Sequence, residues 1–117
     1  MPLIKVQSSV KAPEASAIEG LLKSLSAKLA KHLGKPESYV MTVFEPNVAM
    51  TFGGTLDPVC YMEVKNIGTM RPENTKAMSQ DFCQTINETL GVPINRIYIE
   101  FNDAKGSMWG WNGATFG

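Results

Sequence analysis

The chain begins with Met1-Pro2, and a proline in second place can become a catalytic group. Methionine aminopeptidases remove an initiator methionine when the next side chain is small, as that of proline is. Pro2 would then carry a free secondary amine, which is both a base and a nucleophile. The residues that follow, Leu3 to Val6, are typical of a β-strand, so this amine would sit at the end of a sheet. Met-Pro is also a common way for a chain to start, so the other residues must decide.

Lys35 is a second candidate, because its ammonium group could bind a carboxylate. It lies between Gly34 and Pro36, where a lysine is more typical of a solvated turn. A positive charge near Pro2 would lower the pKa of the amine, since it disfavours a second positive charge. An ordinary α-amino group titrates at about 7.7–8.0 and a secondary amine is more basic, so such lowering is needed near pH 7.

The composition argues against several other classes of protein. A chain of 117 residues predicts one domain, residues 1–117, with a sizeable core. Lysine plus arginine balance aspartate plus glutamate at 11 each, so nothing indicates nucleic acid or an anionic membrane as a partner. No stretch reaches the length of a membrane span, and no secretory signal precedes the first strand. The expected location is the cytoplasm, with secretion without a signal peptide left open.

The cysteines and the histidine give no sign of a metal or redox site. Cys60 and Cys83 are expected to be buried thiols, and they do not form a CxxC motif. His32 is the only histidine and should interact with the dipole at the C-terminal end of a helix. No second histidine or acid is spaced to form a metal site or a triad with it. No metal and no cofactor are therefore expected.

Hydrophobic periodicity divides the chain into alternating strands and helices. Strands are expected over 2–7, 39–45, 59–64 and 96–102, and helices over 14–33 and 72–90. Each helix is followed by a glycine–x–proline motif, and the two motifs are 91 − 34 = 57 residues apart. The same offset aligns the apolar positions of both helices, so the chain is predicted to be a pseudo-repeat with halves of about 1–57 and 58–117.

The repeat predicts an α/β (α+β) fold built from two β-α-β units. Each unit should have parallel strands joined by a right-handed crossover, giving a four-stranded mixed sheet with both helices on one face. On the last strand, Ile97 and Ile99 should face the helices, while Tyr98 and Glu100 face the other way. That second face is partly apolar and has no helix left to cover it, so another subunit is expected there.

Taken together, these features resemble the macrophage migration inhibitory factor family of the tautomerase superfamily along nearly the whole chain. The matching residues are Pro2, Gly34-Lys35-Pro36 with Tyr39, Phe52-Gly53-Gly54, Ile67-Gly68, Arg96-Ile97-Tyr98-Ile99 and Gly110-Trp111-Asn112 with Thr115-Phe116. None of these motifs is specific to the family by itself, whereas their combined order and spacing is. The resemblance implies a homotrimer of tandem β-α-β halves. It also implies a phenylpyruvate tautomerase of the dopachrome isomerase type, in which the N-terminal proline is the acid–base group.

The resemblance assigns roles to individual residues. Pro2 takes the catalytic position, and Lys35 takes that of the lysine that binds the substrate carboxylate. Ile67 takes the position whose backbone N–H contacts the substrate, a small aromatic α-keto acid. Tyr98 takes that of a pocket residue donated by the neighbouring subunit.

Four more residues are expected around the same pocket. Trp111 and Phe116 fall in the family's C-terminal segment, near the pocket mouth. Leu3 and Trp109, together with Ile67 and Tyr98, are expected to bury the amine of Pro2 and so disfavour its ammonium form.

Three positions depart from the vertebrate members of the family. Glu100 replaces an asparagine, Trp109 replaces a valine, and Val59-Cys60-Tyr61-Met62 replaces a CxxC motif, so no thiol oxidoreductase activity is expected. Near the pocket mouth Glu100 would raise the pKa of the amine and repel a substrate carboxylate by about 1–4 kcal/mol. Weak activity toward phenylpyruvate is therefore expected. Glu100 could instead point to solvent or pair with Lys105.

Two other functions remain open at this stage. One is a cytokine-like binding protein with a vestigial pocket and a protein receptor. The other is decarboxylation or hydration of small unsaturated acids, but relatives with that chemistry add arginines or acids around the proline. Arg71 and Arg96 are the only arginines, and the sequence places neither of them clearly near Pro2. Any role as a base also requires that Met1 be removed, because the Pro2 nitrogen is otherwise an amide.

Overall fold

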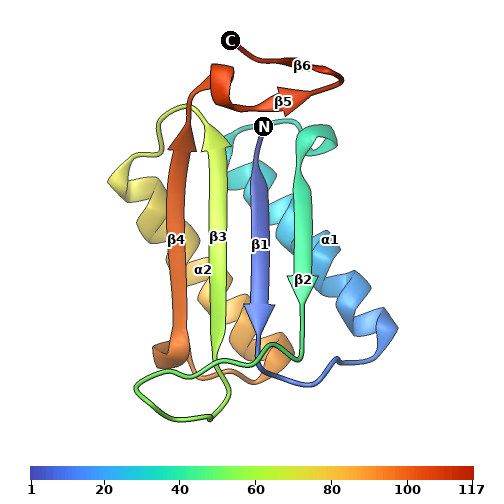
Figure 1. Cartoon of the computed structure of the whole chain (residues 1–117), viewed down its shortest axis with the longest axis vertical. Helices are drawn as coiled ribbons and strands as arrows, with labels where there is room; N and C mark the ends of the chain where they lie inside the picture. Colours follow the sequence, from blue (N-terminus) through green and yellow to red (C-terminus); the bar gives the residue numbers. More distant parts are fainter.

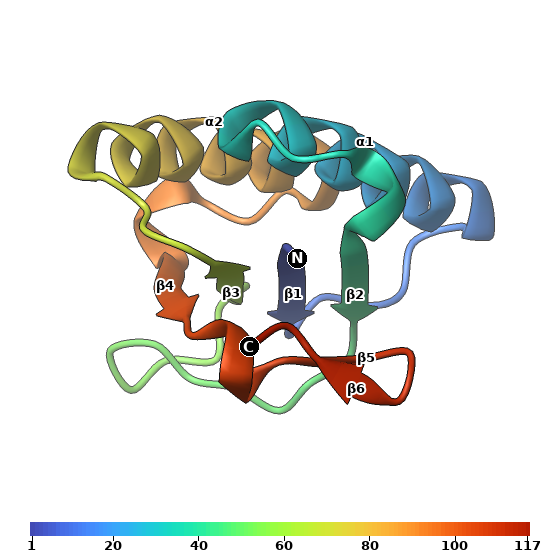
Figure 2. The same ribbon diagram turned by 90° about the horizontal axis from the view of Figure 1, so that it is seen from above.

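The computed structural model describes all residues 1–117 and has two helices packed on one face of a four-stranded sheet (Figures 1 and 2). The strands are β1 (Leu3–Ser8), β2 (Met41–Glu45), β3 (Cys60–Ile67) and β4 (Ile97–Ala104), and the helices are α1 (Ala15–Leu33) and α2 (Pro72–Leu90). The strand order is β2-β1-β3-β4. β1 is parallel to β2 and β3 is parallel to β4, while the central β1–β3 pair is antiparallel. The mixed sheet of two β-α-β halves is thus confirmed.

Both helices end as their glycines predict. Gly34 adopts the left-handed conformation with a φ of 62°, which a residue with a side chain rarely adopts. The next N–H, that of Lys35, donates to the carbonyl oxygen of Ala30 at 3.0 Å, which closes the last turn of α1. Pro36 then prevents the helix from continuing. The consequence for the site is that Lys35 occupies a fixed position directly after the helix.

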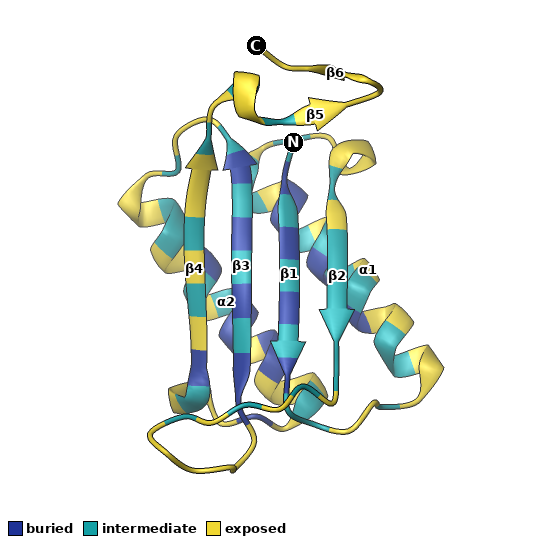
Figure 3. Ribbon diagram, in the orientation of Figure 1, coloured by how far each residue is buried: buried dark blue, intermediate teal, exposed yellow.

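The core lies between the sheet and the two helices (Figure 3). Along β1 and β3 every second side chain is buried, because successive side chains of a strand point to opposite faces. The core consists of Ile4, Val6, Leu21, Leu25, Leu29, Cys60, Met62, Val64, Met78, Phe82, Cys83, Ile86, Val92 and Ile97. Both cysteines are free and buried, as expected.

The opposite face of the sheet carries no helix (Figure 2). On β4, Ile97 is buried, whereas Tyr98 is 66% exposed and Glu100 is also exposed. Met41 of β2 is 62% exposed on the same uncovered face. The expected sorting of side chains between the two faces is therefore confirmed. No helix of the structure combines the length and the apolarity that crossing a membrane requires.

Two of the differences between the observed and the expected strand boundaries bear on the site. Residues Glu37–Tyr39 form a short 3-10 turn, so β2 begins at Met41 rather than at Tyr39. Pro36 starts this turn, and its fixed backbone sets the chain at an angle to the strand. β3 continues to Ile67 instead of ending at residue 64, so Asn66 lies in the strand and not in a turn.

The C-terminal tail is ordered, which its glycine content did not suggest. After a 3-10 turn (Gly106–Met108), β5 (Gly110–Trp111) and β6 (Ala114–Thr115) form a hairpin across the end of the sheet where the chain starts (Figure 1). The two turn residues, Asn112 and Gly113, have φ of 53° and 75°. Asn-Gly is the sequence most typical of a two-residue hairpin turn with positive φ, so this signal was present in the sequence.

His32 lies in the last turn of α1 as expected, but it also has a partner on α2. Its Nε2 lies 2.7 Å from Oδ2 of Asp81, and Nζ of Lys28 donates to Oδ1 of the same carboxylate at 2.7 Å. Burial alone would raise the pKa of Asp81. The hydrogen bonds and charges of Lys28 and His32 outweigh that effect and lower the pKa. The cluster thereby joins the two helices through one carboxylate.

Candidate active site

Pro2 is fully buried at the start of β1, where it lines a cavity of about 260 Å³. Its carbonyl oxygen accepts a hydrogen bond from the backbone N–H of Met41 at 3.1 Å, which fixes the residue to the edge of β2. The side chains that line the cavity come from three segments: Met1, Pro2, Leu3, Ser38, Tyr39, Val40, Met41, Trp109, Gly110 and Trp111. Leu3 and Trp109 are therefore near Pro2, as the sequence predicts.

Lys35 lines a second cavity of about 450 Å³ beside the first. It shares this cavity with Met1, Pro36, Tyr39, Ile67 and Phe116. Met1 and Tyr39 belong to both cavities, so the two are neighbours around the N-terminus. The structure thus brings Lys35, Ile67 and Phe116 together with the start of the chain, from segments far apart in the sequence.

The positive charge of Lys35 affects the pKa of the N-terminal amine. Partial burial, and secondly the positive charge of Lys35, lower the pKa of the α-amino group of Met1 from its ordinary value. Lys35 itself forms no ion pair with any carboxylate of the chain. An amine at this end of the sheet is consequently biased toward its neutral form, and Lys35 remains available to an anionic ligand.

The tail hairpin supplies an aromatic wall to this region. The ring of Trp111 stacks on that of Phe116 with centroids 5.9 Å apart, and it meets the edge of Tyr39 at the same distance. The N–H of Phe116 donates to the carbonyl oxygen of Gly106 at 3.1 Å. A Cβ atom on Gly106 would lie 2.8 Å from the carbonyl oxygen of Phe116, so glycine is required for the tail to fold back.

Tyr98 lies at the other end of the sheet from Lys35. It pairs with Tyr61 near the start of β3, whereas Ile67 ends that strand, 67 − 61 = 6 residues later. At about 3.3 Å per residue, the two positions are roughly 20 Å apart. Tyr98 instead packs on Phe52, with ring centroids 4.9 Å apart, beside another cavity of about 460 Å³. Tyr98 therefore does not help to bury Pro2 of its own chain.

Glu100 lies on the uncovered face of β4, directly opposite Glu63 of β3. It forms no ion pair with Lys105 or with any other residue. Burial, a hydrogen bond to Glu63, and the charges of Glu63 and Glu100 together raise the pKa of Tyr61. Glu100 thus contributes negative charge to this face, and like Tyr98 it lies away from Pro2 of its own chain.

Arg96 has a structural role that the sequence did not reveal. Its guanidinium donates hydrogen bonds to four backbone carbonyl oxygens of one loop: Pro58 at 2.8 Å, Asp57 at 2.9 Å, Phe52 at 3.2 Å and Thr55 at 3.4 Å. It also lies over the ring of Phe52, 5.3 Å from the centroid. Neither Arg96 nor Arg71 lines the cavities at Pro2, so no arginine of the same chain assists the amine.

Two residues near the site were not singled out from the sequence for this place. Tyr39 lines both cavities at the N-terminus because the 3-10 turn directs it there instead of into β2. Asn66 is buried beside Lys35 in a further cavity. The available signal for Asn66 was its core-facing position, two residues after Val64, in a strand that alternates buried and exposed positions.

Comparisons with known proteins agree over the whole chain. The family model described as macrophage migration inhibitory factor (MIF) matches residues 1–117. The macrophage migration inhibitory factor homolog of Brugia malayi is 37% identical over 117 residues, which cover 100% of both chains. The macrophage migration inhibitory factor of Rattus norvegicus is 34% identical over 116 residues, 99% of each.

The fold comparison gives the same result. The crystal structure of a macrophage migration inhibitory factor homologue from Prochlorococcus marinus has a TM-score of 0.93 and is 50% identical. The match covers 98% of this chain and 99% of that chain.

Proposed function

The chain belongs to the macrophage migration inhibitory factor family, and from this premise we propose that it is a keto–enol tautomerase. The proposed substrates are aromatic α-keto acids related to phenylpyruvate, with weak turnover of phenylpyruvate itself. The observation that carries the proposal is the position of Lys35 beside the N-terminus, next to a buried Pro2 and an aromatic wall. Lys35 can bind a carboxylate, Pro2 can move a proton, and the aromatic wall can pack against the ring of a substrate.

The proposed chemistry moves one proton between carbon and oxygen. After removal of Met1, the neutral amine of Pro2 takes a proton from the methylene carbon beside the ketone. The Pro2 ammonium then gives this proton, directly or through water, to the carbonyl oxygen, which becomes the enol hydroxyl, and the amine is neutral again. In the opposite direction the amine takes the hydroxyl proton by the same route, and its ammonium form delivers that proton to the carbon. Lys35 holds the carboxylate, so that the methylene carbon is oriented toward the amine.

Two properties of the N-terminal region support Pro2 as this base. A base for the reaction must be neutral near pH 7, yet its ammonium form must be acidic enough to return the proton. Burial disfavours the charged form of an amine, and so does a nearby cation. Pro2 is fully buried, and the charge of Lys35 already lowers the pKa of the adjacent amino group of Met1.

We further propose that the active assembly is a homotrimer with each pocket between two subunits. The uncovered sheet face, with Tyr98 and Met41 exposed, supports this assembly. So does the division of the predicted site into two parts roughly 20 Å apart along β3, which one chain does not bring together. Light scattering should give three times the chain mass of 12.8 kDa. A stable monomer at micromolar concentration would contradict the assembly.

The decisive experiment measures tautomerisation of phenylpyruvate and p-hydroxyphenylpyruvate by protein whose N-terminus has been established by intact mass. Chains that start at Pro2 should be active, whereas chains that retain Met1 should be inactive. Pro2→Ala should lose most of kcat, and Lys35→Ala should chiefly raise KM. Full activity in Pro2→Ala would require another base. If the mature wild-type protein binds a keto acid without turning it over, the protein is a binding protein with a vestigial pocket and not an enzyme.

A further inference from the structure

Asn66 breaks the pattern of the strand to which it belongs. On β3 the side chains of Cys60, Met62 and Val64 face the helices and are buried, and Asn66 continues that series with 3% exposure. An apolar residue is expected at such a position. Its Oδ1 is the one buried side-chain polar atom of the chain with no hydrogen-bond partner. A buried acceptor without a donor costs about 1–3 kcal/mol, so its presence calls for a physical reason.

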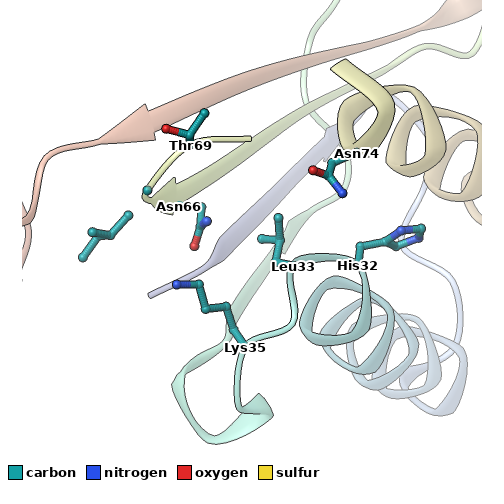
Figure 4. A pocket seen from close by; sticks show the side chains of 8 residues that line it. His32, Leu33, Lys35, Asn66, Thr69 and Asn74 are labelled. Carbon is teal, nitrogen blue, oxygen red and sulfur yellow. The ribbon is translucent and has the colours of Figure 1, made fainter. Parts of the chain in front are cut away.

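The cavity beside Asn66 contains a donor that also lacks a partner. Asn66 and Lys35 line the same space of about 230 Å³, between the end of β3 and the adjoining ends of the helices. Figure 4 shows the amino group of Lys35 directed toward the carbonyl end of the Asn66 amide. Of the other polar side chains of this cavity, His32 bonds Asp81, and the amide oxygen of Asn74 accepts from the N–H of Arg71.

Lys35 lies against both sides of the end of β3. Asn66 and Ile67 are consecutive strand residues, so their side chains point to opposite faces of the sheet. Lys35 lines one cavity with Asn66 and another with Ile67 and Phe116, beside the N-terminus. An ammonium group has three donors, so it can bond Asn66 on the helix side and still offer two N–H groups to a carboxylate.

We propose that Asn66 is a positioning residue for Lys35. A rotation of the Lys35 side chain brings its ammonium to the unpartnered Oδ1, and the resulting hydrogen bond holds the lysine at the end of β3 before the substrate arrives. A hydrogen bond to the charged form raises the pKa of a lysine. The part of this inference that concerns turnover rests on the proposed tautomerase function, whereas the contact between the two side chains does not.

Two measurements that need no turnover test the contact. The first is the titration of the Lys35 side chain, followed by NMR of the labelled carbon next to its amino group. The second is the dissociation constant of phenylacetate, a carboxylate that does not tautomerise. Asn66→Ala should lower the pKa of Lys35 and weaken phenylacetate binding about 3- to 10-fold, the range of one ordinary side-chain hydrogen bond. In a Lys35→Met background the same change should leave phenylacetate binding unaltered.

A nearly isosteric variant, Asn66→Asp, distinguishes an effect on Lys35 from a general effect on folding. Asn66→Asp should raise the pKa of Lys35, because a carboxylate stabilises the ammonium, and should weaken phenylacetate binding, because it competes for the same cation. Thr69→Ala is the matched control from the same cavity and should change neither quantity. Urea unfolding establishes that each variant is folded.

Two results would overturn the inference. One is an unchanged pKa of Lys35 in both Asn66 variants. The other is an equal loss of phenylacetate affinity with and without Lys35, which would make Asn66 a structural residue only. For an active enzyme, Asn66→Ala should raise KM and leave kcat nearly unchanged. If the wild-type protein has no tautomerase activity, the proposed function fails. The titration of Lys35 still decides whether Asn66 holds it, even if phenylacetate does not bind.

Discussion

Ile67 and Tyr98 lie at opposite ends of the parallel β3–β4 pair, roughly 20 Å apart, although both are predicted to contact the same substrate. One chain therefore does not complete the predicted pocket. Under the proposed function the missing part comes from a neighbour, and the proposed trimer is then required for activity and not merely for stability.

Mixed assemblies should recover activity from two inactive variants. Pro2→Ala replaces the secondary amine of proline by a primary amine, and Tyr98→Ala lacks the neighbour's contribution, so each should be nearly inactive when it is refolded alone. After co-refolding in equal amounts, about a quarter of the pockets should combine an intact Pro2 with an intact Tyr98 from the next subunit. The measurement is kcat per chain. No gain over the separate variants would place both residues in the pocket of one chain.

Glu100→Asn should raise kcat/KM for phenylpyruvate several-fold and affect p-hydroxyphenylpyruvate less. If a neighbour brings Glu100 to the pocket, its charge repels the substrate carboxylate and stabilises the Pro2 ammonium. Its removal lowers the pKa of the amine, so the loss of activity on acidification should move to lower pH. The control is Glu63→Gln, which removes a charge from the paired position on β3. Equal pH–rate profiles for Glu100→Asn and wild type would leave Glu100 a surface residue.

The stability of the helix pair should depend on pH through Asp81. Its pKa is lowered in the folded protein, so its contribution is present above its unfolded pKa of about 3.9 and is lost as pH falls through the folded value. Asp81→Asn should cost about 1–3 kcal/mol at pH 7, by urea unfolding, and little at pH 2. Glu19→Gln removes a pair exposed on the surface of α1 and should cost less than about 0.5 kcal/mol at either pH.

Neither thiol should react with a disulfide reagent while the protein is folded. Burial, and secondly the charge of Cys83, raise the pKa of the Cys60 thiol to about 12, so almost no thiolate exists near pH 8. Cys83 is likewise buried, and its pKa is raised by that burial. Titration with a chromogenic disulfide should detect both thiols only after unfolding. A Cys60-dependent reduction of a model disulfide by the folded protein would contradict this.

The sequence predicted the sheet well because the 57-residue offset linked local periodicity to topology. Once two strand–helix–strand units are recognised, the crossover rule determines the parallel pairs and the side on which the helices lie. The tail hairpin was not predicted, although Asn112-Gly113 is a strong local signal for a two-residue turn. The bond between His32 and Asp81 joins residues 49 positions apart and depends on how the two helices pack. Hydrophobic periodicity within each helix does not specify which residues of α1 lie opposite which residues of α2.

The candidate site was predicted in part for the same reason. Pro2, Lys35 and Ile67 each lie at the end of a strand or helix, and the topology alone brings those ends together. The topology does not determine the orientation of a single side chain. Asn66 faces Lys35 because β3 continues to Ile67, three residues beyond the strand end predicted at residue 64. The separation of Tyr98 from Pro2 follows from strand direction, and it becomes meaningful only once a second chain is considered.

The C-terminal hairpin also bears on how this protein could change over evolutionary time. None of the core residues comes from the segment after Ala104, so the tail that forms the aromatic wall adds nothing to the buried interior. Substitutions at Trp111 or Phe116 can therefore alter which molecules fit near Pro2 without disturbing the packing of the core. Pro2 and Lys35 belong to the frame of the β-α-β halves, whereas the aromatic wall belongs to the tail. Under the proposed function, we expect substitutions in the tail to change ligand preference and to leave the chemistry the same.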